Sequence, residues 1–236
     1  MIVLIRGHIR NSFDSPTLYD RIKELHTIGI SLQIYIHTWK HKQNNISWRT
    51  VEADTTIITK KKIKEYFRDM SRFIKYIQID DDSKIKLIGR IEGTVCNSPM
   101  PLIGWKNYWY GQYAILKYIH EHHAFNENIL NIRFDLFQYN HQIRTDQFQD
   151  FVIVNQFNFF HKNVFFFRNE QDHCIDNIYM GNIFTMFSLC EHFHKNLDNI
   201  MKQYPTIQNQ EFMVSLENTR LFQFPKPEPI RKSKNK

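Results

Sequence analysis

The sequence predicts an α/β fold with a mostly parallel central sheet flanked by helices. Residues 2–5 form a short run of β-branched and aliphatic side chains, which is typical of a buried strand. Ser15 and Pro16 then suit the start of a helix, and Gly29 suits its end. Residues 32–37 alternate between apolar and polar side chains, as a strand does. A strand, a helix and a strand of these lengths form a βαβ unit, so we expect the two strands to be parallel neighbours.

Later segments continue this order of strands and helices. Apolar residues at helical spacing, or in an apolar run, predict helices over residues 60–70, 105–120 and 183–197 and from about residue 208. Apolar alternation or apolar runs predict strands over residues 73–79, 84–89, 129–132, 150–155 and 163–167, and around 48–51.

Composition favours one compact domain with an anionic partner. The chain has 236 residues, is 42% hydrophobic and carries a formal charge of +7, which suits a nucleotide, a nucleic acid or a membrane surface without choosing among them. Its three cysteines have no paired spacing, and no apolar run is long enough for a membrane span. We therefore expect a soluble cytoplasmic protein. Residues 225–236 form a basic, proline-spaced tail, which we expect to be disordered and able to contact anionic membrane lipids.

Two loops should meet at one edge of the predicted sheet, because parallel strands end at the same edge. The first loop contains Arg6, Gly7, His8 and Arg10; the second, residues 37–39, contains His37 and Trp39. Two guanidinium groups beside a glycine suit a diphosphate, because arginine presents a planar fork to phosphate oxygens. The histidine and tryptophan rings could cover a base or a sugar. The alternative is that the arginines are solvated on a surface loop and Trp39 belongs to the core.

A carboxylate follows an inner strand at the same edge. The predicted strand 129–132 runs into Arg133 and Asp135, and ligands of open α/β sheets bind where such strands end. Asp135 is therefore our leading ligand or metal residue; the alternative is that it caps a turn and pairs with Arg133. Residues 80–82 are three aspartates after another strand, which could bind a cation, but we favour a turn.

Two further segments contain candidate site residues. The helix over residues 105–120 is aromatic on most sides in its first half, and Trp105 and Lys106 at its start are the best candidates to line a pocket. Asp176 and Asn177 precede the apolar helix 183–197, where a partly desolvated carboxylate suits a general base. The alternative is that Asp176 is the helix N-cap.

Taken together, these elements resemble a GT-A glycosyltransferase, a single Rossmann-like domain. Five strings carry the resemblance, and they span nearly the whole chain: Ile5-Arg-Gly-His-Ile-Arg-Asn-Ser-Phe13, Ile34-Tyr-Ile-His-Thr-Trp39, Gly104-Trp-Lys-Asn-x-Trp-Tyr-Gly111, Ile132-Arg-Phe-Asp-Leu136 and Asp176-Asn-Ile-Tyr-Met-Gly181. They are similar to segments of small glycosyltransferases of large DNA viruses and bacteria that build surface glycans, and the first string is the most specific.

The resemblance implies a nucleotide-sugar donor, a glycan acceptor and no nucleic-acid partner, in the cytoplasm or, for a viral protein, the host cytoplasm. It implies a nucleotide-binding half (residues 1–125) and an acceptor half (126–224). Residues 6–10 would hold the nucleotide-sugar, Asp135 would take the place of the second Asp of Asp-x-Asp on Mn²⁺ or Mg²⁺, and Asp176 would be the inverting base or an acceptor-binding residue. Arg133 replaces the first acidic residue of that motif, so it could instead stabilise the leaving diphosphate without a metal.

Two other classes of protein fit the composition. A basic nucleic-acid-binding protein would use the charge and the 15% aromatic content, although here the basic residues are dispersed and the carboxylates follow strands. A non-catalytic nucleotide-sugar or glycan-binding module would share the pocket but not the chemistry.

Overall fold

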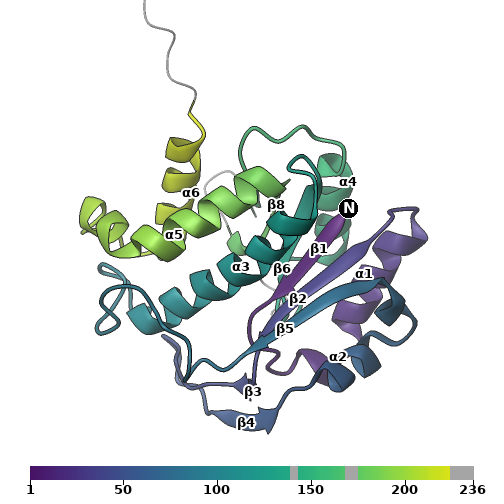
Figure 1. The fold of residues 1–236 in the computed structure, drawn as a ribbon, viewed down its shortest axis with the longest axis horizontal. Coiled ribbons are helices and arrows are strands. Elements are labelled where there is room, and N and C mark those ends of the chain that lie inside the picture. Colours follow the sequence, from purple (N-terminus) through teal and green to yellow (C-terminus); the bar gives the residue numbers. More distant parts are fainter. Residues whose placement is uncertain (139–142, 168–174, 224–236) are drawn as a thin grey trace, which may run out of the picture.

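A six-stranded sheet forms the centre of the protein (Figure 1). The computed structural model describes residues 1–138, 143–167 and 175–223; the predicted tail 225–236 and Cys174 lie outside them. In spatial order the strands are β5 (Ile74–Asp80), β2 (Gln33–Trp39), β1 (Ile2–Arg6), β6 (Asn128–Arg133), β8 (Ile175–Asn182) and β7 (Val164–Phe166). A second, two-stranded sheet pairs β3 (His41–Gln43) with β4 (Asp54–Ile57).

The directions of the strands confirm the predicted fold class. Strands β5, β2, β1 and β6 are parallel to one another, whereas β8 runs antiparallel to β6 and β7. The result is an α/β fold with a mixed, mostly parallel sheet. The helices are α1 (Thr17–Thr27), α2 (Lys60–Phe67), α3 (Leu102–His122), α4 (Thr145–Asn155), α5 (Ile183–Gln203) and α6 (Gln210–Leu221), with 3-10 turns at Ser12–Asp14 and Arg68–Phe73.

Strand β1 shows why the sheet is covered on both faces. Val3 and Ile5 pack in a core with side chains of α1, α2 and α4, whereas Ile2 and Leu4 pack on the opposite face with α3, α5 and α6. Figure 1 shows α3 and α5 on one side of the sheet and α1 and α2 on the other. All four side chains are fully buried, which stabilises the fold by roughly 1.5–3 kcal/mol each. The uninterrupted apolar run is therefore the signature of a strand between two helical layers.

The prediction of a strand over residues 150–155 is wrong, because this segment belongs to helix α4. Phe148 and Val152, four residues apart, are fully buried, whereas Val154 is 70% exposed. One-sided burial at this spacing is the pattern of an amphipathic helix. At the start of the helix the Gln147 side chain accepts a hydrogen bond from the backbone N–H of Arg144. The run of β-branched residues had favoured a strand.

Two shorter predicted strands are also absent. Residues 48–51 lie in the loop between β3 and β4, and residues 84–89 form an irregular segment after β5. The second segment leaves the sheet edge to pack near α5, where Asp198 accepts a hydrogen bond from the backbone N–H of Arg90 at 2.9 Å. Within the described residues, no helix is both long and apolar enough to cross a membrane.

Candidate active site

The directions of four strands bring the predicted site residues to one edge of the sheet. Arg6 ends β1 and lies in register with His37 on β2 and with Arg133 on β6. Strand β8 is antiparallel to β6, so its beginning, with Asp176, lies at the edge where the parallel strands end. Asp176 therefore lies at the start of a strand and not at the start of the apolar helix that the sequence predicts after it. Asn182, at the other end of β8, is the N-cap of α5.

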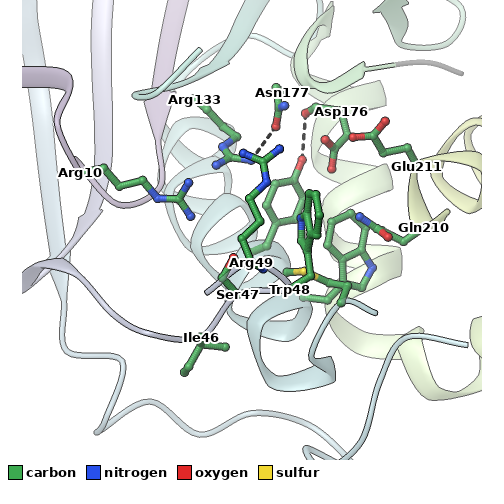
Figure 2. A pocket seen from close by; sticks show the side chains of 13 residues that line it. Arg10, Ile46, Ser47, Trp48, Arg49, Arg133, Asp176, Asn177, Gln210 and Glu211 are labelled. Atoms are coloured by element: carbon green, nitrogen blue, oxygen red, sulfur yellow. Dashed lines mark hydrogen bonds between the residues drawn. The ribbon is translucent and has the colours of Figure 1, made fainter. Parts of the chain in front are cut away.

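A pocket opens at this edge, between the sheet, α3, α6 and the loop after β3 (Figure 2). It is lined by Arg10, Ile46, Ser47, Trp48, Arg49, Met100, Trp105, Tyr108, Arg133, Asp176, Asn177, Gln210 and Glu211. An adjoining pocket shares Arg10, Ile46, Met100, Tyr108 and Arg133 and extends to Arg6, Gly7, His8, Trp39, Asn44, Gly104 and Asn107. Because they share five residues, we treat the two as one site.

Asp135 connects two arginines of the pocket. Its Oδ2 atom accepts hydrogen bonds from Arg10 Nη1 at 2.7 Å and from Arg133 Nη2 at 2.6 Å. The Asp135 side chain is 3% exposed, whereas each arginine side chain is 24% exposed. Burial raises the pKa of the Asp135 carboxyl, but Arg133 and Arg10 outweigh burial, so the pKa lies below its usual value. Asp135 therefore stays ionised behind the two guanidinium groups.

Arg6 is held in the wall of the adjoining pocket by buried partners. Its Nε donates to Asn131 Oδ1 at 2.8 Å, and its Nη2 donates to the Asp176 carbonyl at 2.6 Å and to the Tyr108 hydroxyl at 2.9 Å. The guanidinium carbon lies 4.5 Å from the centre of the Tyr108 ring. Arg6 is 2% exposed, and its Nη1 has no hydrogen-bond partner among the described residues. The adjoining pocket is thus lined by a fixed cation with unused donors.

The loop after β1 has an unusual backbone. Gly7 has φ of 99°, and Arg10 has φ of 51°, a left-handed conformation that non-glycine residues rarely adopt. The Gly7 N–H donates to the His37 carbonyl at 3.1 Å, and the Arg10 N–H donates to the Lys42 carbonyl at 3.0 Å. These bonds hold the strained loop in place and direct the Arg10 side chain to Asp135 and the pocket.

His8 lines the site as a neutral group. Its ring stacks on Trp39 with 5.8 Å between centroids. Burial, followed by the charges of Arg10 and Arg133, lowers its pKa from 6.5 to about 3. At neutral pH the imidazole can therefore contribute hydrogen bonding and apolar surface but no positive charge.

Two predicted site residues do not line the pocket. His37 is 1% exposed, its ring packs edge-on against Trp39, and its Nε2 lies 3.1 Å from Asp80 Oδ2. Lys106 forms an ion pair with Asp198 of α5 at 2.7 Å. Of the two residues proposed at the start of α3, only Trp105 borders the pocket, where it stacks on Tyr108 at 4.7 Å.

Asp176 is 4% exposed at the start of β8, and its carbonyl accepts hydrogen bonds from Arg6 and Tyr108. The next residue, Asn177, accepts a hydrogen bond at Oδ1 from Arg133 Nη1 at 2.8 Å, as Figure 2 shows. In the same view Asp176 and Glu211 lie on the side of the pocket opposite Arg10. The pocket thus has a basic side and an acidic side.

Several pocket residues were missed from the sequence. Tyr108 of α3 lines the pocket although the sequence did not single it out. Trp48 and Arg49 belong to the segment predicted as a strand, whereas Trp48 is 53% exposed and its ring centre lies 4.4 Å from the Arg49 guanidinium. Gln210 and Glu211 reach the pocket from the start of α6. Only the N-cap Asn209 marked this helix start, and nothing in the sequence indicated that it faces the sheet edge.

The acidic run at residues 80–82 leads from the end of β5, at Asp80, into a turn, as the sequence favours. The Lys84 N–H donates to the Asp81 carbonyl at 2.9 Å, closing the turn. Asp80 lies 3.1 Å from His37, and Asp81 accepts a hydrogen bond from Lys40 at 3.0 Å. Their carboxylates therefore have protein partners.

The residues present do not fit a divalent cation at Asp135. The carboxylate oxygen Oδ2 is shared by two guanidinium groups, so a cation there would meet two positive charges at hydrogen-bond distance from its ligand. Hard cations prefer several oxygen ligands, and the described residues contain no group of three acidic, histidine or cysteine side chains placed to hold a metal.

Comparison with known proteins gives structural likeness only. No protein-family model matches the chain, and no curated protein matches it. Among solved structures it is similar to the galactosyltransferase LgtC in complex with donor and acceptor sugar analogues, at TM-score 0.48 and 10% identity over 94% of this chain and 70% of that one. It is also similar to an active-site mutant of LgtC, at TM-score 0.47 and 11% identity with the same coverage. Likeness at this level assigns no residue a role.

Proposed function

We propose that the protein is a glycosyltransferase that moves a sugar from a nucleotide-sugar donor to a hydroxyl group of a growing surface glycan. The observation that carries the proposal is that Arg10 and Arg133 line the same pocket as the carboxylate residue Asp176, at the carboxyl edge of the parallel strands. Open α/β sheets bind their ligands at this edge. The resemblance of the sequence to GT-A glycosyltransferases supports the same assignment.

The basic side of the pocket suits the diphosphate of the donor. Arg6, Arg10 and Arg133 all line this side of the site. Guanidinium groups bind phosphate oxygens through charge-assisted, often bidentate hydrogen bonds. When the bond from the anomeric carbon to the phosphate oxygen breaks, its electron pair stays on the diphosphate, and fixed positive charge stabilises that leaving group.

The acidic side of the pocket suits the acceptor. A hydroxyl oxygen of the acceptor attacks the anomeric carbon, and the Asp176 carboxylate takes its proton as the general base. Attack in line with the departing oxygen inverts the anomeric centre. Glu211 lines the same side of the pocket as Asp176 and is placed to contact an acceptor sugar. In this assignment residues 1–125 form the donor half and residues 126–224 the acceptor half.

The substitution Asp176→Asn tests the proposal, because it removes the base and keeps the size of the side chain. We expect nucleotide-sugar binding to persist while turnover falls by about 10²–10⁴-fold, the usual contribution of a positioned base. Asp150→Asn on α4, away from the pocket, is the matched control and should keep full turnover. Equal turnover in the Asp176 variant and the wild type would remove Asp176 from the mechanism. Binding without any turnover in the wild type would instead indicate a non-catalytic binding module.

A further inference from the structure

We propose that Arg6, Arg10 and Arg133 bind the donor diphosphate without a divalent cation, and that Asp135 is a positioning residue that orients two of these arginines. This inference rests on the proposed function, since it specifies how the same site would hold its donor. It assigns to Asp135 a role different from the metal ligand that the sequence predicted.

The first argument is the use of the Asp135 carboxylate. One oxygen accepts from Arg10 at 2.7 Å and from Arg133 at 2.6 Å, and the side chain is 3% exposed. A cation at this oxygen would have to displace both guanidinium groups from a buried carboxylate. Breaking such a pair is costly, because it leaves charges without a partner in a poorly solvated place.

The second argument is charge. Three arginines and one aspartate leave two net positive charges on the basic side of the site, the same charge that Mg²⁺ or Mn²⁺ would supply. The pKa of Arg133 is raised above its ordinary value, because Asp135 and Asp176 outweigh the opposing effect of burial. The Arg133 guanidinium therefore keeps its positive charge beside the two carboxylates.

The third argument is the supply of unused donors. Among the described residues, one guanidinium nitrogen of Arg10 donates a hydrogen bond, to Asp135. Two nitrogens of Arg133 donate, one to Asp135 and one to Asn177. Arg6 Nη1 is buried and has no hydrogen-bond partner among the described residues. The other two nitrogens of this guanidinium, Nε and Nη2, both donate hydrogen bonds to protein groups. A buried cationic donor without a partner is unfavourable in the free protein and suits an anionic ligand.

The backbone at Arg10 fits this role. Its φ of 51° is a strained conformation for a residue other than glycine, and it is fixed by the hydrogen bond to the Lys42 carbonyl. Strain of this kind collects at ligand sites, where the surrounding structure determines the conformation. Here it brings Arg10 to the carboxylate that Arg133 already contacts, so that both face the same ligand.

The test measures nucleotide binding rather than activity. UDP, GDP, CMP and dTDP, and a sugar conjugate of each, are titrated calorimetrically into the full chain in the presence of Mn²⁺, of Mg²⁺ and of EDTA. Mn²⁺ alone is titrated in parallel and followed by electron paramagnetic resonance. We expect one nucleotide class to bind with the same affinity under all three conditions, and Mn²⁺ alone not to bind. Affinity that rises more than about tenfold with Mn²⁺, or 1.4 kcal/mol, would overturn the inference and leave the proposed function standing.

No binding of any nucleotide under any condition would overturn the proposed function, and this inference with it.

Variants separate the two roles, diphosphate binding by the arginines and positioning by Asp135. Arg10→Lys keeps the charge but loses the planar fork, so we expect weaker nucleotide binding, unchanged by EDTA. Asp135→Asn should weaken nucleotide binding and raise KM more than it lowers kcat, with no change in metal response. If Asp135→Asn instead abolished a response to Mn²⁺ that the wild type shows, Asp135 would be a metal ligand. Arg72→Gln, an exposed arginine before β5, is the control.

Discussion

Replacing His8 should flatten the dependence of stability on pH. The folded protein holds the pKa of His8 at about 3, through burial first and then through the charges of Arg10 and Arg133, against 6.5 for the free side chain. Below pH 6.5 the unfolded chain takes up this proton, whereas the folded protein does not until about pH 3. The contribution of His8 to the free energy of unfolding is therefore fully present above pH 6.5 and is lost as the pH falls from 6.5 to about 3.

The magnitude follows from the size of the displacement. One pKa unit corresponds to about 1.4 kcal/mol, so His8 accounts for a loss of about 1.4 kcal/mol for each pH unit below about 6, and at most about 5 kcal/mol in total. In His8→Asn the side chain does not titrate, so its free energy of unfolding should fall less steeply on acidification than that of the wild type.

Urea unfolding at several pH values between about 7 and 4.5 measures this difference. Asn107→Ala removes a side chain that does not titrate from the same pocket, so it serves as the control: its curve should be displaced from that of the wild type but parallel to it. Parallel curves for His8→Asn and the wild type would refute the reasoning, because they would show that His8 takes up its proton equally in both states.

Three further predictions follow from the packing and charge of the site. Gly111→Ala should destabilise the fold by about 1–3 kcal/mol in chemical unfolding, because a Cβ atom there would lie 2.6 Å from the His37 ring; an unchanged midpoint would contradict this packing. Gly7→Ala should lower the free energy of unfolding by about 1–2 kcal/mol through the φ of 99° alone, since no atom lies within 4 Å of an added Cβ. If Gly7→Asn lowered it by the same amount, backbone strain would not be the cause. Arg133→Met should weaken nucleotide binding by about tenfold or more through lost charge-assisted hydrogen bonds, measured by calorimetry, whereas Arg72→Met should bind as the wild type does.

The sequence predicted those parts of the fold that are set by local patterns. The βαβ unit at the start of the chain was predictable because an apolar run, a helix start and an alternating strand follow one another within 39 residues. The parallel register then places Arg6 beside Arg133 across β1 and β6, which is why candidate site residues from distant segments could be brought to one edge. Residues 150–155 were mistaken for a strand, because β-branched side chains occur on the exposed face of α4 as well as in sheets.

The site was only partly predictable, because its geometry depends on contacts between distant segments. The antiparallel direction of β8 brings Asp176 to the pocket, and no local pattern encodes that direction. Lys106 is turned away by an ion pair with Asp198, 92 residues further along the chain. The pairing of Asp135 with both Arg10 and Arg133 is of the same kind: the spacing of Arg133 and Asp135 suggested one contact, and only the folded loop after β1 adds the second.

The measurement that tests the central claim most directly is a thermal-shift panel of UDP-, GDP-, CMP- and dTDP-sugars at two salt concentrations, on the wild type and Arg133→Met. The account predicts that one nucleotide-sugar class raises the melting temperature of the wild type selectively, and that Arg133→Met loses this shift. A wild type that responds to no nucleotide-sugar but binds oligonucleotides with steep salt dependence would contradict it, and would identify the arginine-lined pocket as part of a nucleic-acid-binding surface.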